Sequence, residues 1–154
     1  MVRLEPMDPD RFEAYIRALI RSYADDNVRA GRWTADEAIA ESRKQVEGLL
    51  PQGAATPNHY LLSIMAEPGE DPVGTIWLAI EPRGGFIYDL EVFEPYRRRG
   101  FAEQAMRQLE EFSRARGARR LLLHVFGDNR GARQLYDKLG YQETNVMMAK
   151  ALVP

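Results

Sequence analysis

Cysteine is missing from this chain of 154 residues, and histidine occurs only twice, as His59 and His124. Without thiols the chain can form no disulfide and no zinc–thiolate centre, and it has no cysteine nucleophile. Two histidines so far apart in the sequence, with no cysteine to join them, predict no metal site. Thiol chemistry and a metal centre are therefore not expected.

Long apolar runs and an excess of one charge are also missing. No apolar stretch approaches the roughly 20 residues that a membrane helix needs, and the first residues lack the apolar run of a secretion signal. The formal net charge is −2, from 21 basic and 23 acidic side chains, so the basic surplus of a nucleic-acid-binding protein is missing. These absences predict a cytoplasmic protein that binds neither membranes nor nucleic acids.

The composition that remains is that of a folded domain. Apolar residues make up 45% of the chain and charged residues 29%, which is enough apolar material for a buried core. The length fits one domain, expected over residues 1–154, and leaves no room for two. We find no linker, repeat or low-complexity stretch.

The spacing of apolar residues predicts two helices in the first third of the chain. Asp8 followed by Pro9 is typical of a helix start. Apolar residues then recur every three or four positions from Phe12 to Tyr23, and residues 27–32 break the pattern. A capping-box pattern of Thr and Glu opens a second helix that reaches about residue 50.

After residue 50 the sequence pattern changes from helical periodicity to strand-forming segments. Three β-branched and aromatic segments joined by Pro- and Gly-rich turns predict an antiparallel meander. The order is strand, helix, helix, three strands, helix, strand, helix and strand, which is an α/β class of the α+β type with a mixed central sheet. The other elements are expected as strands at 2–7, 60–66, 73–80, 86–93, 120–126 and 141–152, and as helices at 101–117 and 129–140.

A basic turn at residues 97–102 precedes one of these helices. A helix start presents unpaired backbone N–H groups and a partial positive charge, and it therefore attracts phosphate. Gly100 would let the backbone approach a pyrophosphate, and the arginines would add charge-assisted contacts. Taken alone, the arginine run is more typical of a solvated surface, because basic runs are common. The sequence patterns of two other phosphate-binding loops, G-x-x-x-x-G-K-[ST] and G-x-G-x-x-G, do not occur.

A family resemblance supports the phosphate interpretation. Residues 97–102 read Arg-x-x-Gly-x-Ala, which resembles the R/Q-x-x-G-x-G/A signature of the GCN5-related N-acetyltransferases (GNAT). The preceding residues 89–92 and a second block at 129–141, Asn-x-x-Ala-x-x-x-Tyr-x-x-x-Gly-Tyr, are similar to conserved parts of that family. One helix and one strand fit between the blocks, as that fold requires. The resemblance covers residues 88–150, and the first part of the chain matches only in element order.

This resemblance implies a GNAT fold with acetyl-CoA as co-substrate, an amine acceptor and no metal. Backbone groups of Glu91 and Val92 would pair with the pantetheine arm, Asn129 would bind its amide, and Tyr136 would protonate the departing thiolate. The coenzyme-binding residues that it implies are Leu90, Glu91, Val92, Arg97, Arg98, Arg99, Gly100, Phe101, Ala102, Asn129, Ala132 and Tyr136.

Catalytic roles have structural alternatives that the sequence leaves open. Tyr136 lies on an apolar helix face as a core aromatic would, and Asn129 would also serve as a helix cap. Asp89 and Glu91 alternate along one strand, so either could be the general base, or both could be solvent-facing acids. His124, in the middle of a predicted strand, is expected to be a structural histidine.

The acceptor and the assembly are less defined. Three aromatic residues could form a wall for the acceptor or could simply pack in the core: Tyr23, Trp33 and Trp77. The family's habit suggests a homodimer, although no sequence patch indicates one. An acetyltransferase acting on a small-molecule or peptide amine is the favoured hypothesis, and a coenzyme A-binding regulatory module without transfer activity is the alternative.

Overall fold

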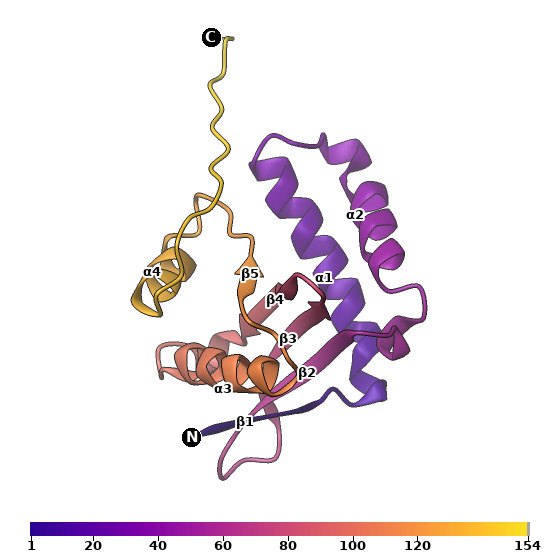
Figure 1. Ribbon diagram of the computed structural model, residues 1–154. Coiled ribbons are helices and arrows are strands. Elements are labelled where there is room, and N and C mark those ends of the chain that lie inside the picture. The colour runs from indigo at the N-terminus through magenta and orange to yellow at the C-terminus, as the bar shows by residue number, and fades with distance from the viewer. Residues whose placement is uncertain (154) are drawn as a thin grey trace.

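The computed structural model describes residues 1–153, in which a five-stranded sheet lies between two pairs of helices (Figure 1). Helices α1 and α2 cover one face, and α3 and α4 lie against the other. The bounds are β1 (Val2–Pro6), α1 (Pro9–Arg29), α2 (Ala35–Leu49), β2 (His59–Ala66), β3 (Pro72–Glu81), β4 (Gly84–Val92), α3 (Phe101–Ala115), β5 (Leu121–Leu123) and α4 (Arg130–Lys138), with short 3₁₀ turns at Gly53–Ala55 and Glu94–Tyr96.

Local signals explain where the first helices begin. The Asp8 side chain accepts a hydrogen bond from the Asp10 amide at 3.0 Å, which confirms the predicted N-cap of α1. Helix α1 nevertheless continues to Arg29, so residues 27–29, which were predicted to break the helix, are part of it. Asn27 is fully buried there, and its side-chain amide donates to the Tyr23 carbonyl at 2.8 Å. That bond keeps this polar residue satisfied within the last turn.

The sheet is mixed, as predicted. Strands follow the order β1-β2-β3-β4-β5, antiparallel throughout except for the parallel pair β4 and β5. On the α3 side the core centres on Ile64, Ile76, Leu78, Met106 and Leu109, which are almost completely buried. The α+β class predicted from the element order is therefore confirmed.

Two strand predictions near the C-terminus are wrong. Strand β5 covers only Leu121–Leu123 instead of 120–126, because the chain turns away towards α4 after its third residue. Residues 141–152 are extended but form no ladder within the described chain. None of the described helices is long and apolar enough to cross a membrane.

Candidate functional site

Strands β4 and β5 separate after a short parallel contact. They pair only from Gly85 with Leu121 to Ile87 with Leu123, whereas β4 runs on to Val92. From residue 88 to residue 92, no strand among the described residues covers this edge of β4. The sheet therefore opens beside the segment that the sequence marked as a coenzyme site.

Backbone alternation decides which groups face this opening. The Phe93 amide donates to the Val73 carbonyl at 2.8 Å, so these residues form a hydrogen-bonded pair of the β3–β4 ladder. In an antiparallel ladder the N–H and C=O groups of alternate residues then point outward. Those residues are Leu90 and Val92, whereas the backbone groups of Glu91 point towards β3. The Val92 carbonyl already accepts a bond from Arg97 Nε at 2.9 Å.

A bulge in β4 aims two consecutive side chains at one face of the sheet. Trp77 of β3 is in register with Asp89 and Leu78 is in register with Ile87, so Tyr88 is the extra residue. Ile87 packs towards α3, while Tyr88 packs towards α1. The bulge consequently turns the next carboxylate, that of Asp89, towards α1 as well.

Asp89 is held by a tyrosine that the sequence analysis did not single out. Tyr15 Oη of α1 donates to Asp89 Oδ2 at 2.8 Å, across 74 residues of sequence. Burial raises the pKa of Asp89 to about 6, although the Tyr15 hydroxyl and the Leu90 amide partly oppose that shift. Only the tertiary fold could reveal this contact, because Tyr15 lies on the apolar face of α1 like its core neighbours.

Glu91 occupies a different environment from Asp89. Its side chain is exposed, and its carboxylate lies 4.0 Å from the Arg97 guanidinium. Its charge nevertheless contributes to raising the pKa of Asp89. Asp89 combines burial with a raised pKa, which is the combination typical of functional carboxylates, whereas Glu91 is exposed.

A cavity of about 420 Å³ adjoins the opening between the strands. Its walls come from α1, α2, β4, the segment after β5 and α4. Asp89 and Leu90 line it from the sheet side. Asn129, Ala132 and Tyr136 line it from the opposite side. Residues from both sequence blocks thus meet around one space.

Tyr136 faces this cavity from α4. Its ring packs edge-on against Tyr141 at a centroid distance of 5.8 Å, and within residues 1–153 its hydroxyl has no hydrogen-bond partner. Burial raises the pKa of Tyr136, and the nearby charge of Asp89 raises it further. The phenol is therefore protonated at neutral pH and available as a donor.

Asn129 caps α4. Its side-chain oxygen accepts a bond from the Ala132 amide at 3.2 Å, which confirms the capping role. The same residue lines the cavity, so its side chain lies where a ligand could reach it.

The basic turn leads directly into α3. Two of its residues have left-handed backbone conformations, Arg98 with φ 65° and Gly100 with φ 80°. A Cβ on Gly100 would meet only Gln104 Nε2, at 3.9 Å, so space beside the backbone is open. Phe101 and Ala102 pack against the core and fix the helix start, while the side chains of Arg97, Arg98 and Arg99 are exposed to solvent.

Of the three aromatic residues considered for the acceptor wall, Trp77 and Tyr23 line the cavity and Trp33 does not. Trp77 is buried and stacks on Tyr88 at 4.6 Å, where it forms part of the cavity lining. Its indole N–H donates to His59 Nδ1 at 2.9 Å. Trp33 instead packs edge-on against Tyr23 at 5.6 Å, and of these two only Tyr23 lines the cavity.

His124 does not have the structural role predicted for it. Strand β5 ends at Leu123, so His124 is exposed and lines the cavity beside Phe126 instead of lying in the sheet interior. No group of three or more potential metal ligands is found in the described part of the chain.

Comparisons with known proteins place these features in context. The model of the acetyltransferase (GNAT) family matches residues 12–141. YycN of Bacillus subtilis, named an uncharacterized N-acetyltransferase, is 40% identical over 98% of this chain and 99% of its own. YdgE of the same organism, named likewise, is 38% identical over 97% of each chain.

Solved structures agree with this match. The crystal structure of the putative acetyltransferase YycN from Bacillus subtilis superposes with a TM-score of 0.94 at 39% identity, over 100% of both chains. The PaiA N-acetyltransferase of Thermoplasma acidophilum, solved in complex with coenzyme A, has a TM-score of 0.66 at 15% identity, over 92% of this chain and 90% of its own. This second likeness concerns the fold alone.

Proposed function

This chain belongs to the acetyltransferase (GNAT) family, and on that premise we propose that it transfers the acetyl group of acetyl-CoA to a primary amine of a small molecule or peptide. Membership of this family makes the chain an acyl-CoA-dependent acetyltransferase. The acceptor and the roles of individual residues are our proposal. The observation that carries it is that Asp89 and Tyr136 line one cavity beside the open edge of β4.

Asp89 is the proposed general base. An amine must lose a proton as its lone pair attacks the thioester carbonyl, and a carboxylate with a pKa of about 6 is mostly ionised at neutral pH. It can accept that proton directly or through water. Glu91, exposed and close to Arg97, is proposed to contribute negative charge near Asp89 and not to act as the base.

Tyr136 is the proposed general acid. As the new C–N bond forms and the C–S bond breaks, the electron pair of that bond stays on sulfur. The phenol, kept protonated by its raised pKa, gives its proton to this thiolate. The products are an acetamide and coenzyme A thiol, and solvent returns the proton from Asp89 to Tyr136.

The coenzyme is proposed to lie along the β4 opening. The outward backbone groups of Leu90 and Val92 suit a pantetheine arm that pairs like an added strand, with Asn129 and Ala132 facing it. The free amides at the start of α3 suit the pyrophosphate, and the exposed arginines at 97–99 suit its charge.

The acceptor end of the cavity favours an amine on an apolar body. Tyr23, Phe86, Tyr88 and Phe126 contribute rings to the lining. Asp89 contributes the carboxylate, because Asp26 is ion-paired with Arg29 and Arg32 also lines the cavity. Aromatic walls favour flat apolar groups, and the Asp89 carboxylate favours an amine. An aromatic ethylamine should therefore be a better acceptor than a diamine or an aminoglycoside of similar reach.

Thiol release from acetyl-CoA across a panel of amines, polyamines, aminoglycosides and peptide N-termini tests the proposed function. Release that depends on the amine, together with a stoichiometric acetamide product, supports transfer. Tight binding of acetyl-CoA without amine-dependent release across the whole panel would favour the regulatory-module alternative.

A further inference from the structure

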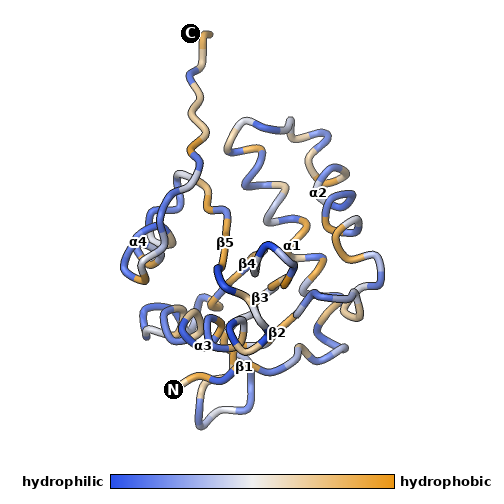
Figure 2. Tube along the Cα trace, viewed as in Figure 1, coloured by the Kyte–Doolittle hydropathy of each residue, from blue (hydrophilic) through white to orange (hydrophobic). Residues whose placement is uncertain are grey.

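The last turns of α1 bury a polar residue on the face where the helix otherwise buries apolar ones. Apolar and hydrophilic residues alternate along α1 (Figure 2), since one face of the helix packs on the sheet. The buried positions of that face are Ile20, Ala24 and Asn27, at the spacing of a single helix face. Asn27 is fully buried, and a buried amide is costly unless its polar groups are bonded.

The side chain of Asn27 orients one arginine of the turn that follows α1. Its Oδ1 accepts a bond from Arg32 Nη1 at 2.9 Å, and its backbone carbonyl accepts a bond from the Arg32 amide at 2.9 Å. The Arg32 guanidinium also lies over the Trp33 ring, 5.4 Å from its centroid. Arg32 is exposed to solvent, yet its backbone, one of its nitrogens and its ring contact are all fixed.

Arg32 lines the same cavity as Asp89, and its charge has no acidic partner there. Within residues 1–153 no carboxylate forms an ion pair with it. Asp26, the other acid of the lining, pairs with Arg29, which also bonds Asp128 at 2.7 Å. Since Asn27 occupies only Nη1 of Arg32, Nε and Nη2 remain as a fork of two donors that an anion can accept.

The two charged groups of this cavity lie far apart along α1. Tyr15 bonds Asp89, and Asn27 holds Arg32. Asn27 lies about three turns, or roughly 18 Å, further along α1 than Tyr15. An α-amino acid is too short to contact both groups, because its amine and its carboxylate share one carbon atom. A ligand that reaches both is elongated, and the aromatic rings of the lining favour an apolar body between its ends.

We propose that Arg32 binds the carboxylate of an elongated acceptor whose amine is directed to Asp89. The chain then acetylates amino acids in which an aromatic body separates the amine from the carboxylate. This inference rests on the proposed acetyl transfer and names the acceptor class of the same site. The guanidinium fork matches the two oxygens of a carboxylate, so it selects this group by geometry as well as by charge. Asn27 is a positioning residue, because it acts through Arg32.

Two derivatives of phenylethylamine test the inference: the para-carboxylate and the para-carboxamide. They differ in charge at the far end of the ring and hardly at all in the basicity of the amine. The wild-type chain should acetylate the carboxylate with a kcat/KM about tenfold higher, which is the low end expected for charge-assisted bonds at an exposed arginine. Arg32→Met should bring the ratio of the two kcat/KM values to about one.

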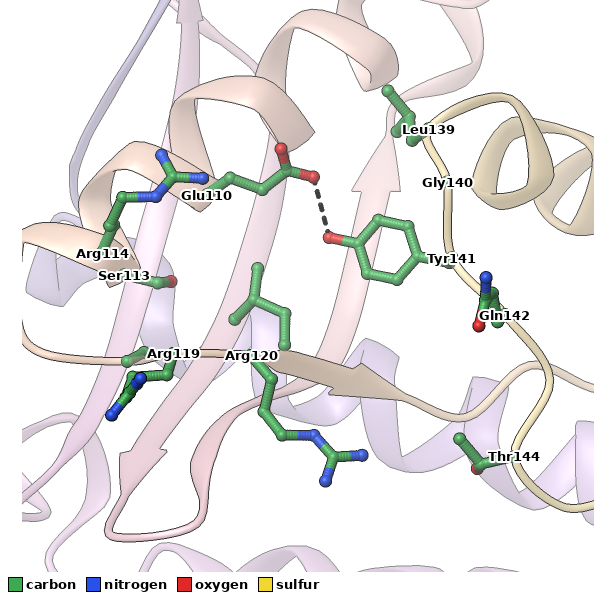
Figure 3. A pocket seen from close by; sticks show the side chains of 12 residues that line it. Glu110, Ser113, Arg114, Arg119, Arg120, Leu139, Gly140, Tyr141, Gln142 and Thr144 are labelled. Carbon is green, nitrogen blue, oxygen red and sulfur yellow. Dashed lines mark hydrogen bonds between the residues drawn. The ribbon is translucent and has the colours of Figure 1, made fainter.

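Arg119→Met is the matched control for the loss of one arginine. Arg119 is also exposed, and it lines a separate cavity beside α3 that is formed by other residues (Figure 3). This variant should keep the tenfold ratio. Asn27→Ala tests the positioning role, because it removes the oxygen that holds Arg32 Nη1. It should lower the ratio, whereas a smaller folded fraction would lower both rates and leave their ratio unchanged. An unchanged ratio in Asn27→Ala would overturn the positioning role.

Failure of this inference is distinguishable from failure of the proposed function. If the carboxamide is acetylated, a wild-type ratio near one, or a preference that survives Arg32→Met, overturns the inference alone. A chain that acetylates neither these compounds nor any amine of the panel contradicts the proposed function instead. Calorimetric titration of both compounds into the complex with coenzyme A then decides the inference without turnover. Tighter binding of the carboxylate that depends on Arg32 supports it, and equal binding of the two compounds overturns it.

Discussion

Asp89 and Glu91 have the same chemistry and almost the same position, yet the fold separates them. Burial raises the pKa of Asp89 to about 6, partly opposed by the hydrogen bond from Tyr15, whereas Glu91 stays exposed beside Arg97. Alternation along the strand predicted that both acids lie on one face, but it could not indicate which of them is the better candidate for the general base. At the scale of residues, the distinction depends on a contact across 74 positions.

Asp89→Asn should remove the base and change the pH profile. Between about pH 5 and 7 the wild-type rate should rise as Asp89 loses its proton, because only the ionised form accepts a proton from the amine. The variant should lose most of the wild-type rate, and the rate that remains should no longer rise over this pH range. Steady-state assays at saturating acetyl-CoA measure both. Glu91→Gln is the matched control and should keep both. Equal effects of the two variants would contradict the assignment.

The same substitution should raise stability near pH 8. The pKa of Asp89 in the folded protein lies above its ordinary value of 3.8, so the native state holds this proton more tightly. Stability is then lost as the pH rises from about 4 to 6, and the cost persists above that window. Asparagine removes the buried charge, and thermal unfolding of Asp89→Asn at pH 8 should show a higher midpoint than that of wild type.

Tyr136→Phe separates a proton donor from a core aromatic. It removes one oxygen and keeps the ring, so packing should hardly change. Loss of a general acid costs about 10²–10⁴ in rate, and a thiolate is a fair leaving group, so the low end is expected. Both kcat and kcat/KM should fall together while acetyl-CoA still binds.

Tyr141→Phe is the neighbouring control for that measurement, since the Tyr141 hydroxyl is bonded to Glu110 and Tyr141 does not line the cavity that Asp89 and Tyr136 share. Its kcat should stay near that of wild type, whereas a loss of one hydrogen bond lowers stability by about 1 kcal/mol. A wild-type kcat for Tyr136→Phe with a good acceptor would remove Tyr136 from the mechanism.

Helix α3 shows how an element positions a binding site. Its first residues pack on the core, so its free amides lie at a defined place beside the end of β4. Gly100 starts it with φ 80°, and Gly117 follows it with φ 90°. These two glycines have the same backbone requirement at opposite ends of one helix.

Gly100→Val should weaken acetyl-CoA binding sharply while the fold survives, as judged by circular dichroism. A branched side chain would occupy the space through which phosphate approaches the backbone, and a left-handed conformation strains any L-residue by about 1–2 kcal/mol. Gly117→Val carries the same strain far from the proposed phosphate site. Titration calorimetry should show a much larger loss of affinity for Gly100→Val, and equal losses would mean that the turn is only a surface loop.

At the scale of the whole molecule, the proposed coenzyme site joins β4, α3 and α4. A ligand that binds only the native state at ~100 times its Kd adds about 2.7 kcal/mol to the free energy of unfolding. For a chain of this size that corresponds to an increase in Tm of roughly 5–10 °C. Acetyl-CoA should produce such a shift in a thermal melt, and NAD or ATP much less. An unchanged Tm at millimolar acetyl-CoA would contradict the proposed site.

The sequence by itself determined the features that local chemistry controls. The cap at Asp8, the capping box of α2 and the glycine before α3 are each set by hydrogen bonds or backbone sterics within a few residues. The two motif blocks likewise identified the family, since their residues lie in sequence order on either side of one helix and one strand.

Only the tertiary structure decided the features that depend on distant partners. The Tyr15–Asp89 contact, the exposure of His124 and the end of the sheet at β5 all follow from how separate segments pack. Residues 141–152 have a strand-like pattern, but a strand forms only where a second backbone accepts its hydrogen bonds. Within residues 1–153 no backbone bonds to residues 142–153, and strand pairing, unlike helix formation, cannot be satisfied locally.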